Sequence, residues 1–463
     1  MDKEGRRVIN MAIMGSKLNG ILKAASCYLK TLALSPLVRN MSKVYSGDIV
    51  SKILAIGTLL LLIKGLSIDE YAAYTAFHTV LFLAPGLVGS GINRALVRFS
   101  AEYLSRVGKR PFELYFLSVA FQITLYIVSC IILFLIANEV NSLLFGQKGF
   151  GLALRYGLIG GLGVLLTQAG RTVYQAEERF GTYIKTLWFK EILTFIVIFF
   201  LFLWKQLNLQ HAVQSMIGVN LVVGTIVISP IFREFSLRRL IAFFNEQLDI
   251  IKSFFSSSGW LIAYCFMLNA FRRLDVFMLS HFSTAEELAN YGVAFRYYSM
   301  ALLLLRSTHA VLLPKFSKID MQDLTRQRQF TLKWLKATVW LIIPIAVGDM
   351  FGKPLFMRMN GIQYEKAFYV FVIFSFGVWF SLMFSPSVNV LMSRRDFKFL
   401  FTLAVGAAVL NFTGNYVIIP LWGGFGAALV TISSIGLINT SVFVKCIRIE
   451  HVGRGESLDP EKV

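Results

Sequence analysis

Twelve long runs of apolar residues divide this chain almost from end to end. A bilayer core about 30 Å thick requires about 20 apolar residues of helix, and each run is long enough to provide them. Hydrophobic residues make up 56% of the chain and charged residues only 16%. Neither a soluble globule nor a disordered chain has this balance, so the sequence predicts an all-α polytopic membrane protein. We expect spans at residues 46–66, 71–92, 113–137, 149–170, 184–204, 211–231, 253–281, 288–312, 332–352, 367–392, 397–419 and 423–446.

The basic residues predict the orientation of these spans. The chain has 46 Lys and Arg against 26 Asp and Glu, a net charge of +20. In a soluble protein this excess would suggest nucleic acid, but in a membrane protein Lys and Arg collect in cytoplasmic loops. One set of alternating loops, together with both termini, holds most of them. The other loops hold only Lys64, Lys148, Lys205, Lys353, Arg358 and Lys366. We therefore expect both termini to be cytoplasmic, and we expect no nucleic-acid partner.

Short motifs recur along the chain at one spacing. Residues 69–74 (DEYAAY) resemble residues 286–291 (EELANY), and each position in one lies 217 residues from its counterpart. The RFS motif at 98–100 and the KFS motif at 315–317 have the same spacing, as do Phe180 and Phe397. All three matches fall at corresponding points of the topology. They predict two six-helix lobes related by a pseudo-two-fold repeat, with a substrate path between them. The alternative is an old duplication with no present role in the mechanism.

The repeat also predicts the organisation of the chain. Residues 46–231 form an N-lobe of six spans and residues 253–446 a C-lobe of six. Residues 232–252 form a cytoplasmic linker, and residues 447–463 form a cytoplasmic tail. Residues 1–45 carry apolar residues at helical spacing with interspersed lysines, which is typical of an amphipathic helix lying at the inner interface. A poorly ordered leader is the alternative interpretation of this tail.

Charged residues inside the predicted spans are the candidates for function, because a charge at membrane depth is costly unless it has a partner, water or a ligand. We expect four arginines to line a cationic cavity that receives phosphate, since they outnumber the acids available in the spans and the guanidinium fork suits phosphate oxygens. These substrate-binding candidates are Arg155, Arg272, Arg273 and Arg306.

Two further pairs are expected to be structural or coupling charges. Asp48 and Lys52 lie four residues apart on one helix face and predict an ion pair within that helix. Asp275 and Arg296 lie on adjoining spans at similar depth and predict an ion pair between helices. Lys190 is expected to extend its amine toward the inner interface.

No pattern in the chain indicates catalysis, a metal or a cofactor. The four cysteines form no CxxC motif, and the five histidines have no metal-ligand spacing. No GxxxxGK[ST] phosphate loop is present. We therefore expect a protein that is not an enzyme, has no catalytic residue and holds neither metal nor cofactor.

Several segments resemble a known family of transporters. Residues 66–74 (LSIDEYAAY) resemble the LGPEEYGLY turn of the polysaccharide biosynthesis flippases, the O-antigen (Wzx-type) transporters. Residues 94–103 (RALVRFSAEY) are similar to the end of the second span in that family, and residues 274–280 and 290–296 are similar to its seventh and eighth spans. The resemblance covers about residues 46–446 and keeps the order of the family. The chain is thus identified as a member of the multidrug/oligosaccharidyl-lipid/polysaccharide exporter superfamily.

The resemblance implies a V-shaped pair of six-helix lobes that works by alternating access. The implied substrate is an undecaprenyl-diphosphate-linked oligosaccharide, an O-antigen or other surface polysaccharide unit, flipped from the inner to the outer leaflet of the bacterial cytoplasmic membrane. The implied partners are this lipid-linked oligosaccharide, membrane lipids and other proteins of surface-polysaccharide or lipopolysaccharide assembly.

Two alternatives remain open. One is a drug/cation antiporter of the same superfamily, which would need buried carboxylates where this chain has more arginines. The other is a membrane-embedded glycan polymerase or glycosyltransferase, which would need an acid/base constellation or a DxD motif, and the chain has no DxD.

Overall fold

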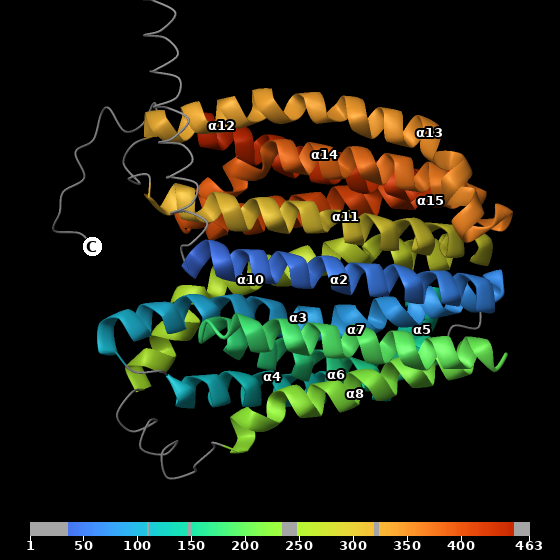
Figure 1. Ribbon diagram of the computed structural model, residues 1–463, viewed down its shortest axis with the longest axis horizontal. Helices are drawn as coiled ribbons and strands as arrows, with labels where there is room; N and C mark the ends of the chain where they lie inside the picture. The colour runs from blue at the N-terminus through green and yellow to red at the C-terminus, as the bar shows by residue number, and fades with distance from the viewer. Residues whose placement is uncertain (1–35, 109–110, 147–150, 234–247, 319–323, 449–463) are drawn as a thin grey trace, which may run out of the picture.

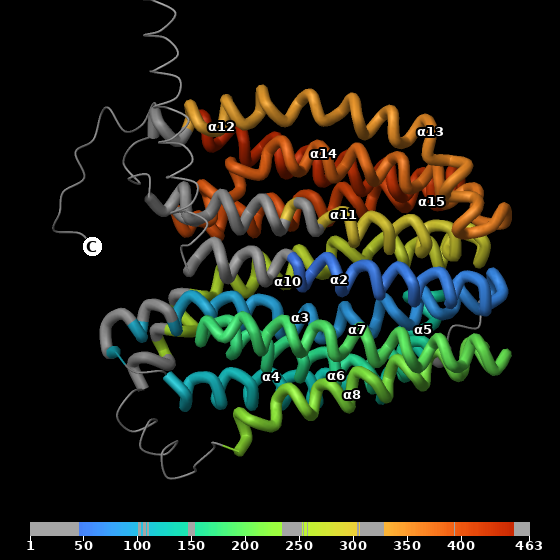
Figure 2. Tube along the Cα trace, viewed as in Figure 1, coloured from blue at the N-terminus to red at the C-terminus, as the bar shows by residue number. Residues whose placement is uncertain are grey.

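The computed structural model describes residues 36–108, 111–146, 151–233, 248–318 and 324–448, and every regular element in these ranges is a helix (Figures 1 and 2). Most of the predicted interfacial tail, much of the predicted linker and nearly all of the C-terminal tail lie outside the described residues. The interpretations of those segments therefore stay predictions.

The described helices follow the predicted spans closely. The first half contains α2 (Pro36–Gly65), α3 (Ile68–Val107), α4 (Phe112–Leu135), the short α5 (Ala137–Phe145), α6 (Gly151–Ala176), α7 (Phe180–Leu203) and α8 (Leu209–Arg233). The second half contains α10 (Leu248–Phe282), α11 (Ala285–Lys318), α12 (Leu324–Thr338), η1 (Val339–Leu341), α13 (Ile342–Asn360), η2 (Ile362–Tyr364), α14 (Glu365–Ser393) and α15 (Phe397–Arg448).

Two of the predicted spans run within α15, and another runs through α12, η1 and α13. The helix α15 breaks at Gly423, where φ is 53° and ψ is −135°. A positive φ of this kind is accessible to glycine at little cost. In the part of the chain that the structure describes, eight stretches of helix are long and apolar enough to cross a membrane by length and composition, and α15 is one of them. The predicted all-α membrane fold is confirmed.

The helices form two lobes. In the first half α3 packs against α6, α6 against α8, and α2 against α7, while in the second half α14 packs against α11 and α15, and α10 packs against α15. Contacts between α3 and both α10 and α11 join the halves, and α2 runs along the boundary in Figure 1. The basic end is the end of the bundle at which α8 finishes with Arg233 and α15 with Arg448. The opposite end carries the turns at Ser67 and Gly423.

The backbone confirms the internal repeat in detail. Glu178 follows α6 and Arg395 follows α14, and these two residues, 217 positions apart, have φ of 57° and 59°. In both turns the next N–H donates to a carbonyl five residues earlier, Arg179 to Tyr174 and Asp396 to Leu391. The two halves therefore leave corresponding helices through the same turn.

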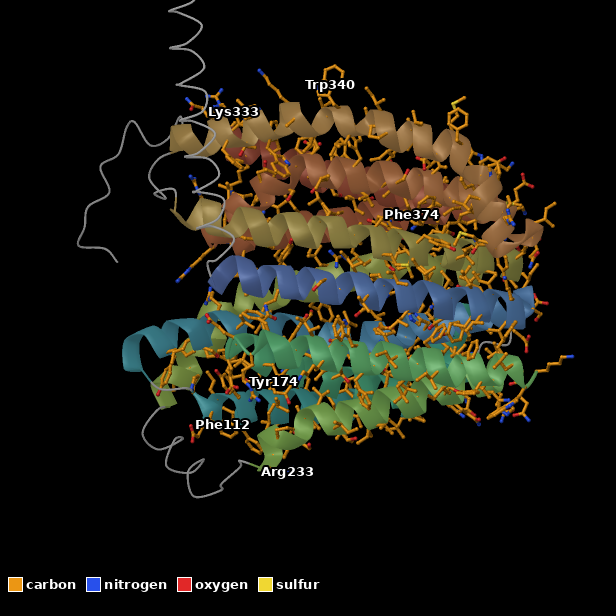
Figure 3. All side chains as sticks on the ribbon, viewed as in Figure 1. Phe112, Tyr174, Arg233, Lys333, Trp340 and Phe374 are labelled. Carbon is orange, nitrogen blue, oxygen red and sulfur yellow. The ribbon has the colours of Figure 1, made fainter. Side chains whose placement is uncertain are left out.

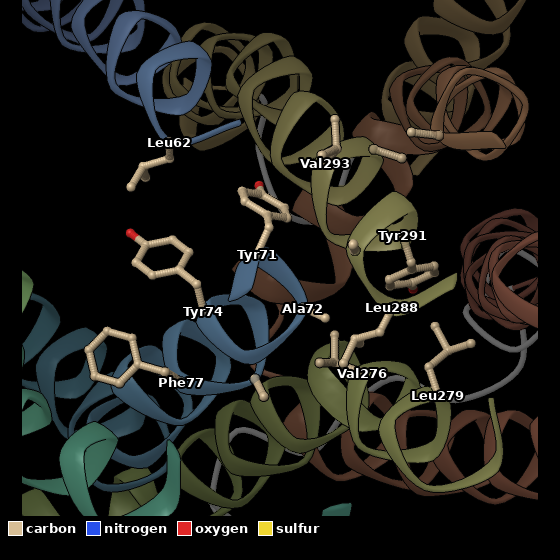
Figure 4. Packing of buried hydrophobic residues seen from close by; sticks show 14 of the residues in the cluster. Leu62, Tyr71, Ala72, Tyr74, Phe77, Val276, Leu279, Leu288, Tyr291 and Val293 are labelled. Atoms are coloured by element: carbon tan, nitrogen blue, oxygen red, sulfur yellow. The ribbon is translucent and has the colours of Figure 1, made fainter. Parts of the chain in front are cut away.

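The lobes touch through small residues. A Cβ on Gly91 of α3 would lie 2.6 Å from Cα of Ile262 on α10, and a Cβ on Gly292 of α11 would lie 2.4 Å from Oγ1 of Thr75 on α3. Small residues allow membrane helices to approach this closely. The buried core continues across the same boundary, where Tyr71 of α3 lies near Val293 of α11 (Figure 4).

The outer surface of the bundle is apolar. Trp340 points away from the second half and is 69% exposed, whereas Phe374 of α14 is completely buried (Figure 3). Large exposed apolar side chains also cover α4, α7 and α13. Such a surface suits contact with lipid, because hydrocarbon does not penalise exposed apolar groups.

Candidate functional site

A small polar cavity lies at the lobe boundary, where α3 meets α10 and α11. Its volume is about 40 Å³, which is room for water but not for a sugar. The polar and charged residues that line it are Thr75, His78, Thr79, Arg273, Arg296 and Ser299.

Two arginines from different helices meet at this cavity. The guanidinium of Arg273, on α10, lies 5.0 Å from the ring centroid of Phe295. That of Arg296, on α11, lies 5.0 Å from the ring centroid of Tyr74 on α3. Aromatic faces stabilise cations at such distances. Within the described residues neither guanidinium forms an ion pair, and the buried Nη2 of Arg296 has no hydrogen-bond partner.

A histidine and a lysine from the first half extend this group. His78 is half-buried on α3, and its ring centroid lies 4.6 Å from that of Phe82. Lys190 of α7 places its Nζ 5.4 Å from the same Phe82 ring and also hydrogen-bonds to Glu191 at 3.1 Å. We call His78, Lys190, Arg273 and Arg296 the cationic cluster. His78, Arg273 and Arg296 line the cavity, and Lys190 lies over the ring of Phe82, which is beside that of His78.

Sequence reasoning placed His78 among scattered histidines without a role. The signal that was available is its spacing, because Tyr74, His78 and Phe82 are four residues apart and therefore share one face of α3. Lys190 was expected to reach the inner interface, whereas the structure places its amine over Phe82 and beside Glu191.

The four predicted cavity arginines do not come together. Arg155 is exposed on α6, and its Nη2 donates to Oδ1 of Asn138 at 3.3 Å. Arg272 is exposed on α10 and, with Arg94 of α3, lies in electrostatic range of Tyr264. Arg306 belongs to α11, but its side chain lies outside the described residues. Among the predicted arginines whose side chains are described, only Arg273 lines the cavity, and Arg296, expected in an ion pair, lines it as well.

The predicted ion pair between Asp275 and Arg296 is wrong. Asp275 is buried on α10 and accepts hydrogen bonds from the Tyr291 hydroxyl at 2.7 Å, from Asn415 Nδ2 at 2.9 Å and from the Thr431 hydroxyl at 2.6 Å. Positions 273 and 275 are two residues apart, so their side chains leave nearly opposite faces of α10. Arg273 faces the lobe boundary, while Asp275 faces the interior of the C-lobe.

The Asp275 group is a closed polar network inside one lobe. Asn415 Nδ2 also lies 3.0 Å from Oδ1 of Asn411, and Nδ2 of Asn411 donates to Thr431 Oγ1 at 3.0 Å. A buried carboxylate among neutral groups can exchange a proton or hold a small cation, because no permanent positive charge occupies it. Within the described residues no three His, Cys, Asp or Glu side chains form a group that suits a metal ion.

A further group of charged residues in the N-lobe lies nearer the basic end. Asp48 and Lys52 are half-buried on α2, and the ion pair predicted between them stays a prediction. Arg171 of α6 donates through Nη2 to the carbonyl of Thr186 at 3.0 Å and through Nε to its hydroxyl at 3.2 Å. Asp48 and Glu191 both lie in electrostatic range of Arg171. This group mixes positive and negative charges and so balances itself.

Comparisons with known proteins agree with this architecture. Residues 37–320, more than half of the chain, match the family model described as polysaccharide biosynthesis protein. No curated protein sequence matches the chain.

Three solved structures illustrate the similarity of fold. The lipid II flippase MurJ in an inward closed conformation has a TM-score of 0.68 at 14% identity over 87% of each chain. An inward-facing multidrug resistance MATE transporter of the MOP superfamily has a TM-score of 0.61 at 14% identity over 88% of this chain and 96% of that one. A MOP superfamily transporter from Pyrococcus furiosus has a TM-score of 0.59 at 14% identity over 91% and 96%. At these identities the likeness shows the MOP transporter fold.

Proposed function

The chain belongs to the polysaccharide biosynthesis protein family, and on that premise we propose that it flips a lipid-linked oligosaccharide across a membrane by alternating access. The observation that carries the proposal is the meeting of Arg273 and Arg296 at the lobe boundary without an ion-pair partner among the described residues. A diphosphate that crosses the membrane loses its water shell at this depth. Guanidinium groups replace that hydration through charge-assisted hydrogen bonds.

The geometry favours an anionic substrate over a cationic drug. A drug/cation antiporter needs a carboxylate that faces the path between the lobes. Asp275 instead points into the C-lobe, and its three hydrogen bonds come from residues of α11 and α15. The groups that face the cavity are His78, Arg273 and Arg296. Likewise, we propose no enzymatic step, because none of these groups is a carboxylate that would act in glycan transfer.

The finer identity of the substrate follows from the family resemblance. We propose an undecaprenyl-diphosphate-linked oligosaccharide, an O-antigen or other surface polysaccharide unit of the bacterial cytoplasmic membrane, with other assembly proteins as partners. The lobes would be residues 46–231 and 253–446, with residues 1–45, 232–252 and 447–463 on the cytoplasmic side.

A transport assay with graded variants tests the proposal. In a deletion strain complemented by Arg273→Ala with Arg296→Ala, surface glycan should fall while the lipid-linked intermediate accumulates, and protein in the membrane should stay at the wild-type level. Each charged hydrogen bond that is lost should remove about 1.5 kcal/mol of substrate stabilisation and so slow export about tenfold. Lysine at both positions should rescue export partly, because it keeps the charge but loses the fork.

The matched control is Arg358→Ala, an exposed arginine near the C-terminal end of α13. It should leave export unchanged. Normal surface glycan in a well-expressed Arg273→Ala, Arg296→Ala variant would exclude this substrate path. Mass analysis of the accumulated intermediate identifies the sugar unit.

The proposed orientation has its own test. With Cys130, Cys265 and the two remaining native cysteines replaced by serine, Arg358→Cys should react with an impermeant thiol reagent in intact cells. Arg233→Cys, at the basic end, should react only after permeabilisation. Labelling of Arg233→Cys from outside contradicts cytoplasmic termini.

A further inference from the structure

An apolar groove lies on the side of the N-lobe, away from the cationic cluster. It has a volume of about 500 Å³ and is lined by α4, α6 and one residue of α8. This volume is in the range of sites that hold small molecules. Its wall residues include Ile127, Ile131 and Phe134 from α4, Ile159 and Leu162 from α6, and Leu221 from α8. Ile131 is 55% exposed, so the groove is open at the surface of the bundle.

The residues that line the groove are apolar apart from the thiol of Cys130 and the hydroxyl of Tyr126. Tyr126 is buried, and its hydroxyl donates to the carbonyl of Leu158 at 2.7 Å. Gly161 makes this contact possible, because a Cβ there would lie 2.2 Å from the Tyr126 hydroxyl oxygen. The groove therefore offers mainly apolar contacts along its length, which suits a hydrocarbon chain.

A positive charge lies one helical turn from the residues that line the groove. Arg155 lies on α6 one turn before Leu158 and Ile159, and residues three and four apart share a helix face. Its side chain is exposed, and its Nη2 donates to the neutral amide of Asn138 on α5 at 3.3 Å. Within the described residues it forms no ion pair. An exposed cation with a neutral partner near an apolar groove complements a phosphate joined to an acyl chain.

The groove is separated from the path between the lobes. The face of α6 that carries Gly157 and Gly160 packs on α3, where a Cβ would lie 2.6 Å from Val80 and 2.7 Å from Leu81. No residue of α10 or α11 lines the groove. A chain that occupies it must therefore enter sideways from the bilayer and not from the cationic cluster.

We propose that this groove is a binding site for an anionic phospholipid, with one acyl chain in the groove and the phosphate on Arg155. The lipid would belong to the leaflet at the end of the bundle opposite the basic end. The site gives a role to Arg155, an exposed arginine that does not line the cavity of Arg273 and Arg296. It requires only that the chain spans a membrane, so it stands apart from the transport proposal.

Native mass spectrometry of the full chain tests the site. The protein is released from nanodiscs that contain equal amounts of phosphatidylglycerol and phosphatidylethanolamine, and the lipids that remain bound are counted. Phosphatidylglycerol should be retained in preference. Arg155→Gln should reduce this retention on the order of tenfold, because one charge-assisted contact is lost. Arg358→Gln, the same change at an exposed arginine of α13, should not.

A second variant tests the groove independently of the charge. Ile159→Trp fills the groove and should reduce retention of both lipids, whereas Ile196→Trp, at a similarly exposed position of α7, should have no effect. Thermal unfolding and monodispersity of each variant confirm that it is folded. Unchanged phosphatidylglycerol retention in Arg155→Gln, or equal losses in Ile159→Trp and Ile196→Trp, would overturn the proposal. Displacement of phosphatidylglycerol by equimolar polyprenyl phosphate would also overturn it, since the groove would then hold the chain of the substrate.

Discussion

The two halves of the molecule have the same turn conformations but differ in the surroundings of their charged residues. Glu178 and Arg395 adopt the same left-handed conformation in equivalent turns. The N-lobe, however, gathers Arg171, Lys190 and Glu191 into a mixed group, whereas the C-lobe buries the single carboxylate of Asp275 among neutral donors. At the position 217 residues before Asp275 stands Thr58, whose hydroxyl donates only to the carbonyl of Leu54 in its own helix.

This difference teaches that the duplication preserved the turns while the polar interiors diverged. Turn geometry is constrained by sterics and hydrogen bonding in both halves alike. The interior polar groups depend instead on contacts between helices, which differ between the two lobes at positions 58 and 275.

The largest effect on stability is expected at Asp275, and a much smaller one at its counterpart Thr58. Asp275→Ala leaves three buried donors without an acceptor and should lower the free energy of unfolding by about 3 kcal/mol. Thr58→Ala should cost less than about 1 kcal/mol, because only a bond within its own helix is lost. Thermal unfolding in detergent measures both. Similar losses at the two positions would remove the contrast between the lobes.

A double variant sharpens the same point. Since Asp275 and Arg296 form no ion pair, their alanine substitutions should destabilise the protein additively, within about 0.5 kcal/mol. If the variant with both Asp275→Ala and Arg296→Ala were more stable than the single variants predict, the result would support the ion pair predicted from the sequence.

The next effect concerns a role that the halves share. Glu70 accepts from the Leu209 N–H at 3.2 Å, and Glu287 accepts from the Gly424 N–H at 2.9 Å, so each anchors the start of the last helix of its lobe. Glu287 also pairs with Lys366. Alanine at either glutamate should cost about 1 kcal/mol, with the larger loss at Glu287. A loss of stability at only one of the two glutamates would show that the equivalent contacts in the two halves do not contribute equally to stability.

The smallest effect lies in the left-handed turns. Glycine adopts a positive φ without the penalty of a side chain, so Glu178→Gly and Arg395→Gly should each be neutral or stabilise by up to about 1 kcal/mol. Gln175→Gly, in the last turn of α6, should instead destabilise by about 1 kcal/mol. Chemical unfolding of the three variants decides this, and destabilisation by Glu178→Gly would show that its side chain matters more than its backbone.

The sequence alone was sufficient for the membrane class, the positions of the helices and the repeat. An apolar run that crosses a bilayer must match its thickness, and it must be helical because a helix forms all backbone hydrogen bonds within the segment. Accordingly, α3, α8 and α14 each contain the span predicted for them. The repeat could be predicted because turns depend on neighbouring residues, so residues 69–74 and 286–291 carry their signal locally.

Only the tertiary structure decided which charges meet. Depth in the membrane can be estimated from position in a span, but the direction of a side chain depends on the rotation and packing of each helix. Arg155 and Arg273 were indistinguishable as buried cations by sequence, yet Arg155 is exposed and donates to Asn138, whereas Arg273 lines the cavity at the lobe boundary. Asp275 and Arg296 share a depth but face different neighbours, because α10 presents its carboxylate to α15 while α11 presents its guanidinium to α3. Contacts between helices distant in the sequence set these directions, and no local pattern of residues encodes them.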